Sequence, residues 1–190
     1  IVRASSETDA TAKGTGTSLK YGASANIGAG VGLNIVLVTN EAKVGSSAVV
    51  SGQGIIIEAV TPAGKKNDLI VWGMAASGGT DSETSVAGSV GVNYVEYTTR
   101  AAVETGADLD STGGLTVKAT APFGLQNLAI SGALASSTGV GAAVAVNVLT
   151  LTTEAYIGTN AFADATGTML INATSSLSPL KVDIPYISDD

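Results

Sequence analysis

The chain has 190 residues, 45% of them hydrophobic and 13% charged, and this balance excludes a disordered, solvating segment. Its formal net charge is −7 and its nine Lys and Arg residues are scattered singly, which argues against nucleic acid and anionic membrane surfaces as partners. Cys and His are absent, so thiol nucleophiles, disulfides, zinc sites of the usual kind and the commonest general base are excluded. The composition therefore indicates no cofactor.

The apolar residues are mainly Ala, Val, Ile and Leu, and aromatic residues make up only 4% of the chain. Such side chains suit narrow β layers, and the 24 Gly residues supply turns. The longest apolar run, from Gly139 to Leu149, is too short for a membrane helix and includes Asn147, so we expect no transmembrane segment. The sequence starts at Ile1 without an initiating Met or an export signal, and we expect a processed product or an excised fragment.

An internal repeat organises the sequence. When Asn34, Asn93 and Asn147 are set equivalent, the surrounding segments align as GAGVGLNIVLVT, AGSVGVNYVEYT and VGAAVAVNVLTLT. The second Asn follows the first by 59 residues, and the third follows the second by 54. The register then continues without a gap as far as Ala48 in the first copy. Self-similarity of this kind is the signature of a repeat architecture.

Further segments extend the repeat. After a one-residue deletion in the first copy, the strand-like segments GIIIEAVTP, GLTVKATAP and TMLINATSS superimpose. LIVWGMAAS from Leu69 also matches LAISGALAS from Leu128. The first copy lacks its leading strand, because residues 7–19 are polar and irregular, while residues 1–5 look like the end of a preceding copy. We predict a single domain over residues 1–190, with repeats at about 20–68, 69–127 and 128–176 and a C-terminal edge or capping segment at 177–190, in which Leu180 to Ile187 forms an edge strand.

The side-chain pattern predicts a bend at each repeated Asn. Val90, Val92 and Tyr94 share one face of the expected strand, whereas Val95 and Tyr97 share the other. A strand that changes its buried face is bent or bulged there. Because Asn tolerates left-handed backbone and bonds its neighbours, we place the three Asn residues at equivalent, stacked corners. A ladder of ligand-binding Asn residues is the functional alternative, although repeated small polar residues more often mark architecture.

Strands separated by Gly, Ser and Thr, without the 3,4-residue apolar rhythm of a helix, predict an all-β fold. A repeat of 54–59 residues suits a β-solenoid, in which each coil buries its face on the next.

A resemblance supports this prediction. GADLDSTGGLTVKAT at residues 106–120 alternates a G-A-x-L segment with a G-x-L-x-V-x-A segment, and it resembles the haemagglutinin-type repeats of large secreted bacterial adhesins. VGAAVAVNVLTLTTEAYIG, followed by MLINATSS, is similar to repeats in giant leukotoxin-like and autotransporter-like filamentous surface proteins. The resemblance covers about residues 22–176. It implies a right-handed parallel β-helix and a location outside the cell or on the bacterial surface.

Acidic residues are the first candidates for a site. Asp108 and Asp110 lie two apart and so share one strand face, as a general acid–base pair would require, but their expected equivalents form no carboxylate ladder. Asp81 and Glu83 in the GGTDSETS loop offer oxygen ligands for at most one calcium ion. Solvated turn charges explain both pairs more simply.

Aromatic and Gly-rich segments are the remaining candidates. Trp72, expected opposite Ser131, and the two tyrosines Tyr94 and Tyr97 could stack on sugars, although packing roles are more common. The Gly-rich run from Gly28 to Gly32 imitates part of a phosphate loop but is followed by neither a helix nor GK[ST]. We therefore assign no catalytic, cofactor-binding or metal residues.

The leading hypothesis is a non-enzymatic, structural or adhesive β-solenoid segment of a large extracellular bacterial surface protein. Its expected partners are a host or neighbouring-cell surface protein or glycan, or further copies of itself. A subunit of a homopolymeric extracellular filament and a polysaccharide-acting β-helix enzyme are the alternatives. Only the filament predicts that this chain associates with itself.

Overall fold

In a computed structural model, which describes residues 1–79 and 81–180, the chain is all-β and its strands pair in parallel. The described residues form no helix, so none of them belongs to a helix that could cross a membrane. The expected edge strand from Leu180 to Ile187 falls outside the described residues except for Leu180, whose amide donates to Leu125 O at 2.9 Å.

Three parallel sheets make up the fold. The long sheet contains β3 (Ala25–Val44), β7 (Thr84–Val103) and β10 (Thr138–Ile157), with β7 in the middle. The short sheet contains β4 (Val49–Gly52), β8 (Asp108–Ser111) and β11 (Phe162–Ala165). The opposite sheet contains β1 (Val2–Ser5), β2 (Ala10–Leu19), β5 (Ile55–Val60), β6 (Asn67–Gly78), β9 (Leu115–Leu134) and β12 (Met169–Pro179).

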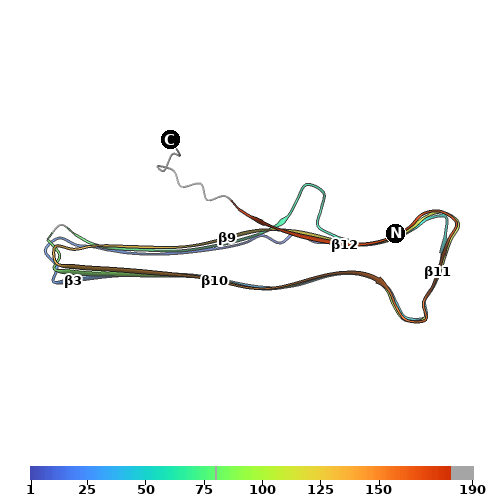
Figure 1. The fold of residues 1–190 in the computed structure, drawn as a ribbon, viewed down its shortest axis with the longest axis horizontal. Helices are drawn as coiled ribbons and strands as arrows, with labels where there is room; N and C mark the ends of the chain where they lie inside the picture. Colours follow the sequence, from blue (N-terminus) through green and yellow to red (C-terminus); the bar gives the residue numbers. More distant parts are fainter. Residues whose placement is uncertain (80, 181–190) are drawn as a thin grey trace.

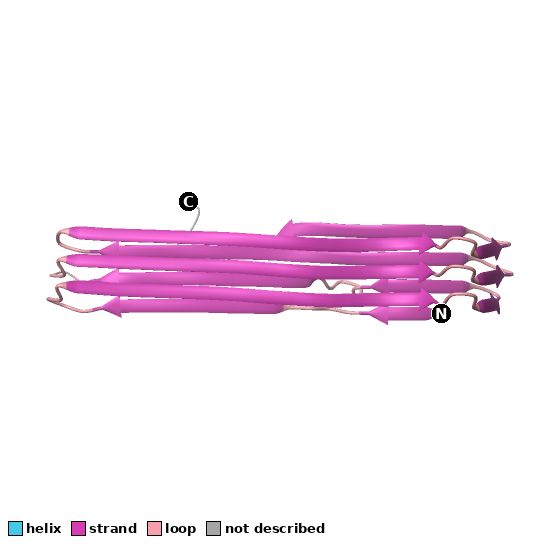
Figure 2. Cartoon of the chain, turned by 90° about the horizontal axis from the view of Figure 1, so that it is seen from below, coloured by secondary structure: helices cyan, strands magenta, loops and turns pink. Residues whose placement is uncertain are grey.

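Along the chain, each strand of the long sheet is followed by a strand of the short sheet and then by strands of the opposite sheet. Figure 1 shows the outcome as an elongated body in which the long and opposite sheets lie face to face, closest at the end near β3 and furthest apart near β11. In Figure 2 the strands of successive passes lie directly beside one another. Parallel strands need a long crossover, and here the return through the other sheets provides it.

Tight turns make the corner between the long and short sheets. Ser47 and Asn160 have left-handed backbone with φ of 59° and 56°, and Gly106 has φ of 72° at the equivalent place. In each case the next residue's amide bonds back to the carbonyl three residues earlier, as in a type II turn. These positions, and not the three repeated Asn residues, are the corners of the fold.

The repeat register around the Asn residues is confirmed. Asn93 lies opposite Asn34 on β3 and opposite Asn147 on β10, and this alignment holds over all twenty residues of the strands. The one-residue shift is also confirmed, because Ile55 and Met169 both pair with Leu115.

The expected equivalence of Leu69 and Leu128 is wrong. Leu69 pairs with Leu125, and Trp72 pairs with Leu128. The cause is the connection between β5 and β6, which consists of residues 61–66. β9 pairs with both of these strands, and only its residues 121 and 122 lie between the two paired stretches. The longer connection shifts the alignment of β6. This loop projects from the opposite sheet in Figure 1.

The prediction that residues 7–19 are irregular is also wrong. Residues 10–19 form β2, which pairs with β6 along its whole length. Its outward residues are Thr or Lys as far as the final Leu19, and its inward residues are Ala, Gly and Ser. Before Leu19 the strand therefore lacks the large apolar residues that usually reveal one. Residues 2–5, in contrast, form β1, which pairs with β5, the strand at the corresponding place in the next repeat.

The apolar core is confined to the part of the molecule near the short sheet, which we call the wide end. Twelve buried residues from all three sheets gather there, including Val103, Leu109 and Leu115. A second cluster adjoins it and contains Tyr97 and Phe123, whose rings meet edge to face with centroids 5.0 Å apart. The other part, in which residues 25–35, 84–94 and 138–148 of the long sheet face the opposite sheet, is called the thin half.

Candidate functional site

The thin half is packed with small residues. The inward positions of β7 before Asn93 are Ser85, Ala87, Ser89 and Gly91, all buried. A Cβ atom on Gly30 would lie 2.0 Å from Met74 O, so the backbones of the two sheets are in direct contact. Sheets normally stack about 10 Å apart because larger side chains separate them. At such a contact no room is left for Val, Ile or Leu, and the buried side chain of Val71 fits inside the thin half only where it lies against Gly32 and Gly91.

The repeated Asn residues form a hydrogen-bonded ladder inside the protein. Asn34 Nδ2 donates to Asn93 Oδ1 at 3.2 Å, and Asn93 Nδ2 donates to Asn147 Oδ1 at 3.0 Å. Asn34 Nδ2 also lies 2.9 Å from Ala10 O, which ties the two sheets together. The predicted stack is thus present, but it lies in the middle of straight strands. Its amides are used within the fold, which favours the architectural interpretation over a ligand ladder.

The buried face of the long strands does not change at the Asn residues, contrary to the prediction. Residues of odd number stay inward from Ser85 to Val103, so Val90, Val92 and Tyr94 point outward. The hydrophobic residues before Asn93 misled the prediction because large apolar side chains normally face inward. Here small residues occupy the inside, and the apolar ones are left on the surface.

These outward residues form what we call the outer apolar face. It consists of five rows across the long sheet, Ile27–Val86–Val140, Ala29–Gly88–Ala142, Val31–Val90–Val144, Leu33–Val92–Val146 and Ile35–Tyr94–Val148. In the central row the exposed fractions are 64% for Val31, 36% for Val90 and 52% for Val144. No row contains a charged side chain. Extended exposed apolar surfaces of this kind mark interaction sites.

A row of charges crosses the long sheet on the same outward side, the third row beyond the outer apolar face toward the wide end. Arg100 Nε lies 3.1 Å from Glu154 Oε2, and Arg100 Nη1 lies 3.4 Å from Glu41 Oε1. A hydrogen bond and the charge of Lys43, helped by Arg100, hold the pKa of Glu41 below its usual value. Glu41 correspondingly raises the pKa of Lys43. The row is a cross-strand ion-pair network, which satisfies its own charges and presents no free pair for proton transfer.

The aromatic candidates have separate roles. Tyr97 is buried, and its hydroxyl lies 3.2 Å from Asn67 Oδ1. Tyr94 is part of the outer apolar face, and its hydroxyl donates to Glu96, which raises the pKa of the tyrosine. Trp72 lies on the outward face of β6, where Nε1 donates to Gln126 Oε1 at 2.6 Å.

The Trp72 ring also lies under Lys13, whose Nζ is 4.3 Å from the ring centroid. These contacts engage one face and the polar edge of the ring. The opposite sheet therefore holds its one Trp in local contacts, and the three aromatic candidates do not form a common platform for a sugar.

The acidic candidates do not converge. Asp108 lies opposite Val49 and Phe162, but Asp110 lies opposite Asp164, a pairing that the sequence alignment missed. Both Asp108 and Asp110 point outward on the exposed short sheet. Among residues 1–79 and 81–180, no group of three or more His, Cys, Asp or Glu side chains is arranged to hold a metal ion.

The loop that contains Asp81 and Glu83 is fixed through a different residue. Both acidic residues are exposed, whereas Ser82 between them is buried. Asn26 Nδ2 donates to Ser82 Oγ at 2.7 Å, and Ser136 Oγ donates to Ser82 O at 2.9 Å. The loop therefore gains its order from serine and asparagine contacts across neighbouring strands.

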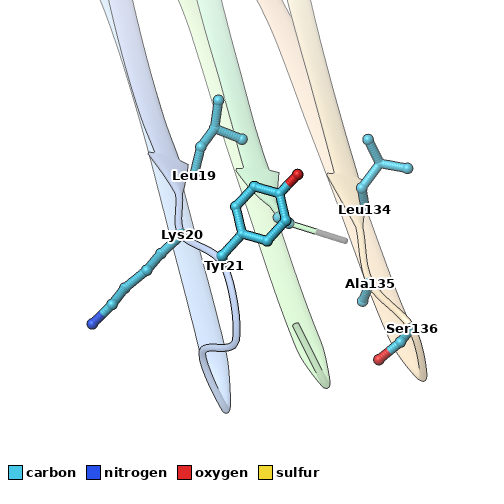
Figure 3. A pocket seen from close by; sticks show the side chains of 8 residues that line it. Leu19, Lys20, Tyr21, Leu134, Ala135 and Ser136 are labelled. Carbon is cyan, nitrogen blue, oxygen red and sulfur yellow. The ribbon is translucent and has the colours of Figure 1, made fainter. Parts of the chain in front are cut away.

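Two hollows on the described surface were considered as sites. The first, of about 540 Å³, lies at the loop end of the thin half and is lined mainly by exposed side chains such as Leu19, Tyr21 and Leu134 (Figure 3). The second, of about 550 Å³, lies by loop 61–66. Of the cations that line it, Arg3 pairs with Glu58 and Lys65 pairs with Glu7, and Lys118 is the third. Glu58 is its one carboxylate, so the second hollow holds no pair of carboxyl groups.

Comparisons with protein-family models, with curated proteins and with solved structures found no match to this chain.

Proposed function

We propose that the chain is a structural and adhesive segment of a large extracellular bacterial surface protein, without enzymatic activity. In this proposal the parallel sheets are a right-handed β-helix built from about three imperfect repeats of 54–59 residues. The resemblance to haemagglutinin-type and leukotoxin-like repeats motivates the cellular setting. Its partners would be a surface protein or glycan of a host or neighbouring cell.

The observation that carries the proposal is the register of the long sheet. β3, β7 and β10 pair over twenty residues each without a bulge, and identical residues meet at the Asn ladder. A fold in which every layer repeats its neighbour is stabilised by nearest-neighbour contacts and extends in one direction. Such an architecture suits a stalk that spaces or displays a surface.

The electrostatics of the surface agree with this proposal. Its closely placed opposite charges form ion pairs between neighbouring strands, as in Glu41–Arg100–Glu154. General acid–base catalysis needs carboxyl groups held on either side of a substrate bond. Asp110 and Asp164 instead lie side by side on an exposed, four-residue strand pair. A polysaccharide-acting enzyme is therefore the less supported alternative.

A filament subunit remains the second candidate, and the open strand edges favour it. β3 and β10 are the two edges of the long sheet. Exposed edges of this length present a row of backbone donors and acceptors to another strand. Within the described residues Asn147 Nδ2 donates to no partner, so the ladder also ends in a free donor at the β10 edge.

Two measurements test the proposal. Small-angle scattering of the dilute protein should give a flat, elongated particle, and a compact globule would contradict the structural part. Beads coated with the folded chain should be retained on immobilised cell-surface glycoproteins. Beads coated with the heat-unfolded chain provide the control, and equal retention of both would contradict the adhesive part.

A further inference from the structure

The outer apolar face has no function inside the protein. The long strands expose it on the side that Figure 2 views, where they run side by side without interruption. Beneath it, the inward residues of the long sheet are Gly, Ala, Ser and Asn, and Val71 of the opposite sheet packs against Gly32 and Gly91. The apolar side chains of the central row thus contribute little to the core, and water covers them in the isolated molecule.

The size of this face marks it as an interaction surface. Five rows at two-residue spacing extend about 27 Å along the strands, and three strands are about 14 Å across, which gives roughly 380 Å² of flat area. That value falls within the range of the largest apolar patches on monomeric proteins, which are often functional. Single exposed apolar residues need no explanation, but a continuous sheet face of fifteen positions does.

The charge pattern favours a protein occupant over an anionic membrane. The chain carries a net charge of −7, and Glu96 lies on the same outward side in the row next to the apolar rows, with Glu41 and Glu154 two rows further along. Carboxylates at the border repel anionic lipid head groups. A second copy of this chain offers an identical flat, uncharged face with the same strand spacing. Sheets of this kind pack face to face with their strands roughly aligned.

The border rows also select the orientation of the two copies. A twofold axis between the faces, crossing the strands at the Val31–Val90–Val144 row, makes the strands antiparallel. The row that contains Glu96 then meets the row that contains Thr84. The reverse choice, an axis along the strands, would place Glu96 against Glu96 of the second copy. The antiparallel arrangement therefore avoids contact between like charges.

We propose that the outer apolar face is an interface between two copies of this chain, packed face to face and antiparallel about the Val31–Val90–Val144 row. The inference deepens the proposed stalk function, on which it rests, because lateral pairing would join neighbouring stalks. Stable protein interfaces bury about 800 Å² per partner, so a face of roughly 380 Å² gives a weak, concentration-dependent dimer. Any further strand added to the long sheet at its edge would enlarge the area of this face-to-face interface.

Single-cysteine crosslinking tests the geometry, because the natural chain has no Cys. Val90 lies on the axis of the proposed dimer and on β7, whose two edges are already occupied by β3 and β10. Because face-to-face sheets lie about 10 Å apart, too far for a direct disulfide, Val90→Cys should be linked to a second copy by a short bismaleimide reagent. Thr98→Cys, at an outward position on the same strand but off the axis, is the matched control and should not. Equal crosslinking of both variants would overturn the proposal.

Sedimentation velocity over a concentration series measures the interface itself. Val90→Lys should raise the dimer dissociation constant by about tenfold or more, since it buries a charge against an apolar face. Thr98→Lys should leave it near the wild-type value. If Val90→Lys leaves the dimer dissociation constant unchanged, self-association occurs through the strand edges and the proposal is wrong. A wild-type chain that stays monomeric would also overturn the proposal.

Vesicle flotation separates the lipid alternative. The wild-type chain should float with neither zwitterionic nor anionic vesicles, and flotation that Val90→Lys abolishes would overturn the proposal in favour of a membrane. Scattering from the dilute monomer provides an independent reading. An elongated monomer without Val90-dependent pairing contradicts only the interface, whereas a globular monomer contradicts the stalk.

Discussion

The wide end and the thin half are packed in opposite ways, with large inward side chains in one and small inward residues in the other, although the same long strands run through both. At the wide end the inward residues of β7 are Val95, Tyr97 and Val103, and they meet the large side chains of the opposite and short sheets. In the thin half the inward residues include Ser89 and Gly91, and the backbones touch. One part is held by buried apolar area, and the other by close backbone contact and an amide ladder.

This difference shows that strand pairing alone does not fix which side of a sheet is apolar. The register continues unchanged across the boundary at Asn93, yet the large side chains move from the inside to the outside. The distance between the sheets decides the outcome, since a gap closed by Gly accepts no larger residue. A substitution that removes or adds side-chain volume should therefore change the free energy of unfolding differently in the two parts.

The largest effect is expected at the wide-end side of the boundary. Phe123→Ala should lower the free energy of unfolding by about 3–5 kcal/mol, because it removes a buried ring that packs against Tyr97. Phe162→Ala, at a 68% exposed position on β11, should change it by less than about 0.5 kcal/mol. Urea unfolding followed by circular dichroism provides both values, and similar losses would contradict the assigned core.

The thin half should respond to added volume. Gly30→Ala should destabilise the protein by about 1–3 kcal/mol, because the new methyl group meets Met74 O. Gly88→Ala is the matched control, since it lies on the outward side of β7 with no atom within 4 Å of the added Cβ. It should be neutral or stabilising by up to about 1 kcal/mol. A stable Gly30→Ala variant would show that the sheets are further apart.

The amide ladder should contribute a comparable amount. Asn93→Leu should cost about 1–3 kcal/mol, because it removes the ladder hydrogen bonds to Asn34 and Asn147 and adds a larger apolar group to a narrow space. Asn147→Leu at the exposed end of the ladder should cost less. Thermal melting of both variants checks this order, and an equal or larger loss for Asn147→Leu would contradict it.

The smallest effect is expected at the Glu41–Arg100–Glu154 ion pairs. Glu41→Gln should lower stability by less than about 1 kcal/mol at neutral pH, because exposed ion pairs contribute little. Since folding lowers the pKa of Glu41, its contribution is present above the ordinary value of 4.5 and is lost as the pH falls through the folded value.

Unfolding curves collected at several acidic pH values measure this contribution. The wild-type chain should lose its advantage over Glu41→Gln as the pH falls below about 4.5. An advantage that persists unchanged in strong acid would exclude Glu41 as its source.

The sequence predicted the parts of the fold that identical residues mark. The Asn34–Asn93–Asn147 register could be found because the repeat runs there without a gap. Trp72 was placed against the wrong residue because similar apolar segments align equally well three residues away, and only the longer loop before β6 distinguishes them.

Two other features gave a misleading signal. β2 was missed because its inward residues are small, as the thin half requires. The outer apolar face was interpreted as a buried face because hydrophobic alternation reports which residues share a side, and not whether that side faces the core. Asp110 and Asp164 were not paired because the equivalents considered for the acidic pair correspond to Asp108 and not to Asp110.

Thiol accessibility tests the inverted packing of the thin half most directly. Ser89→Cys and Val90→Cys introduce neighbouring single thiols on β7, one inward and one outward, into a chain that has none. At dilutions where the protein is monomeric, we expect a maleimide reagent to label Val90→Cys rapidly and Ser89→Cys slowly, because only exposed thiols react readily. Faster labelling of Ser89→Cys would place the Val90 row inside and would contradict the inverted packing.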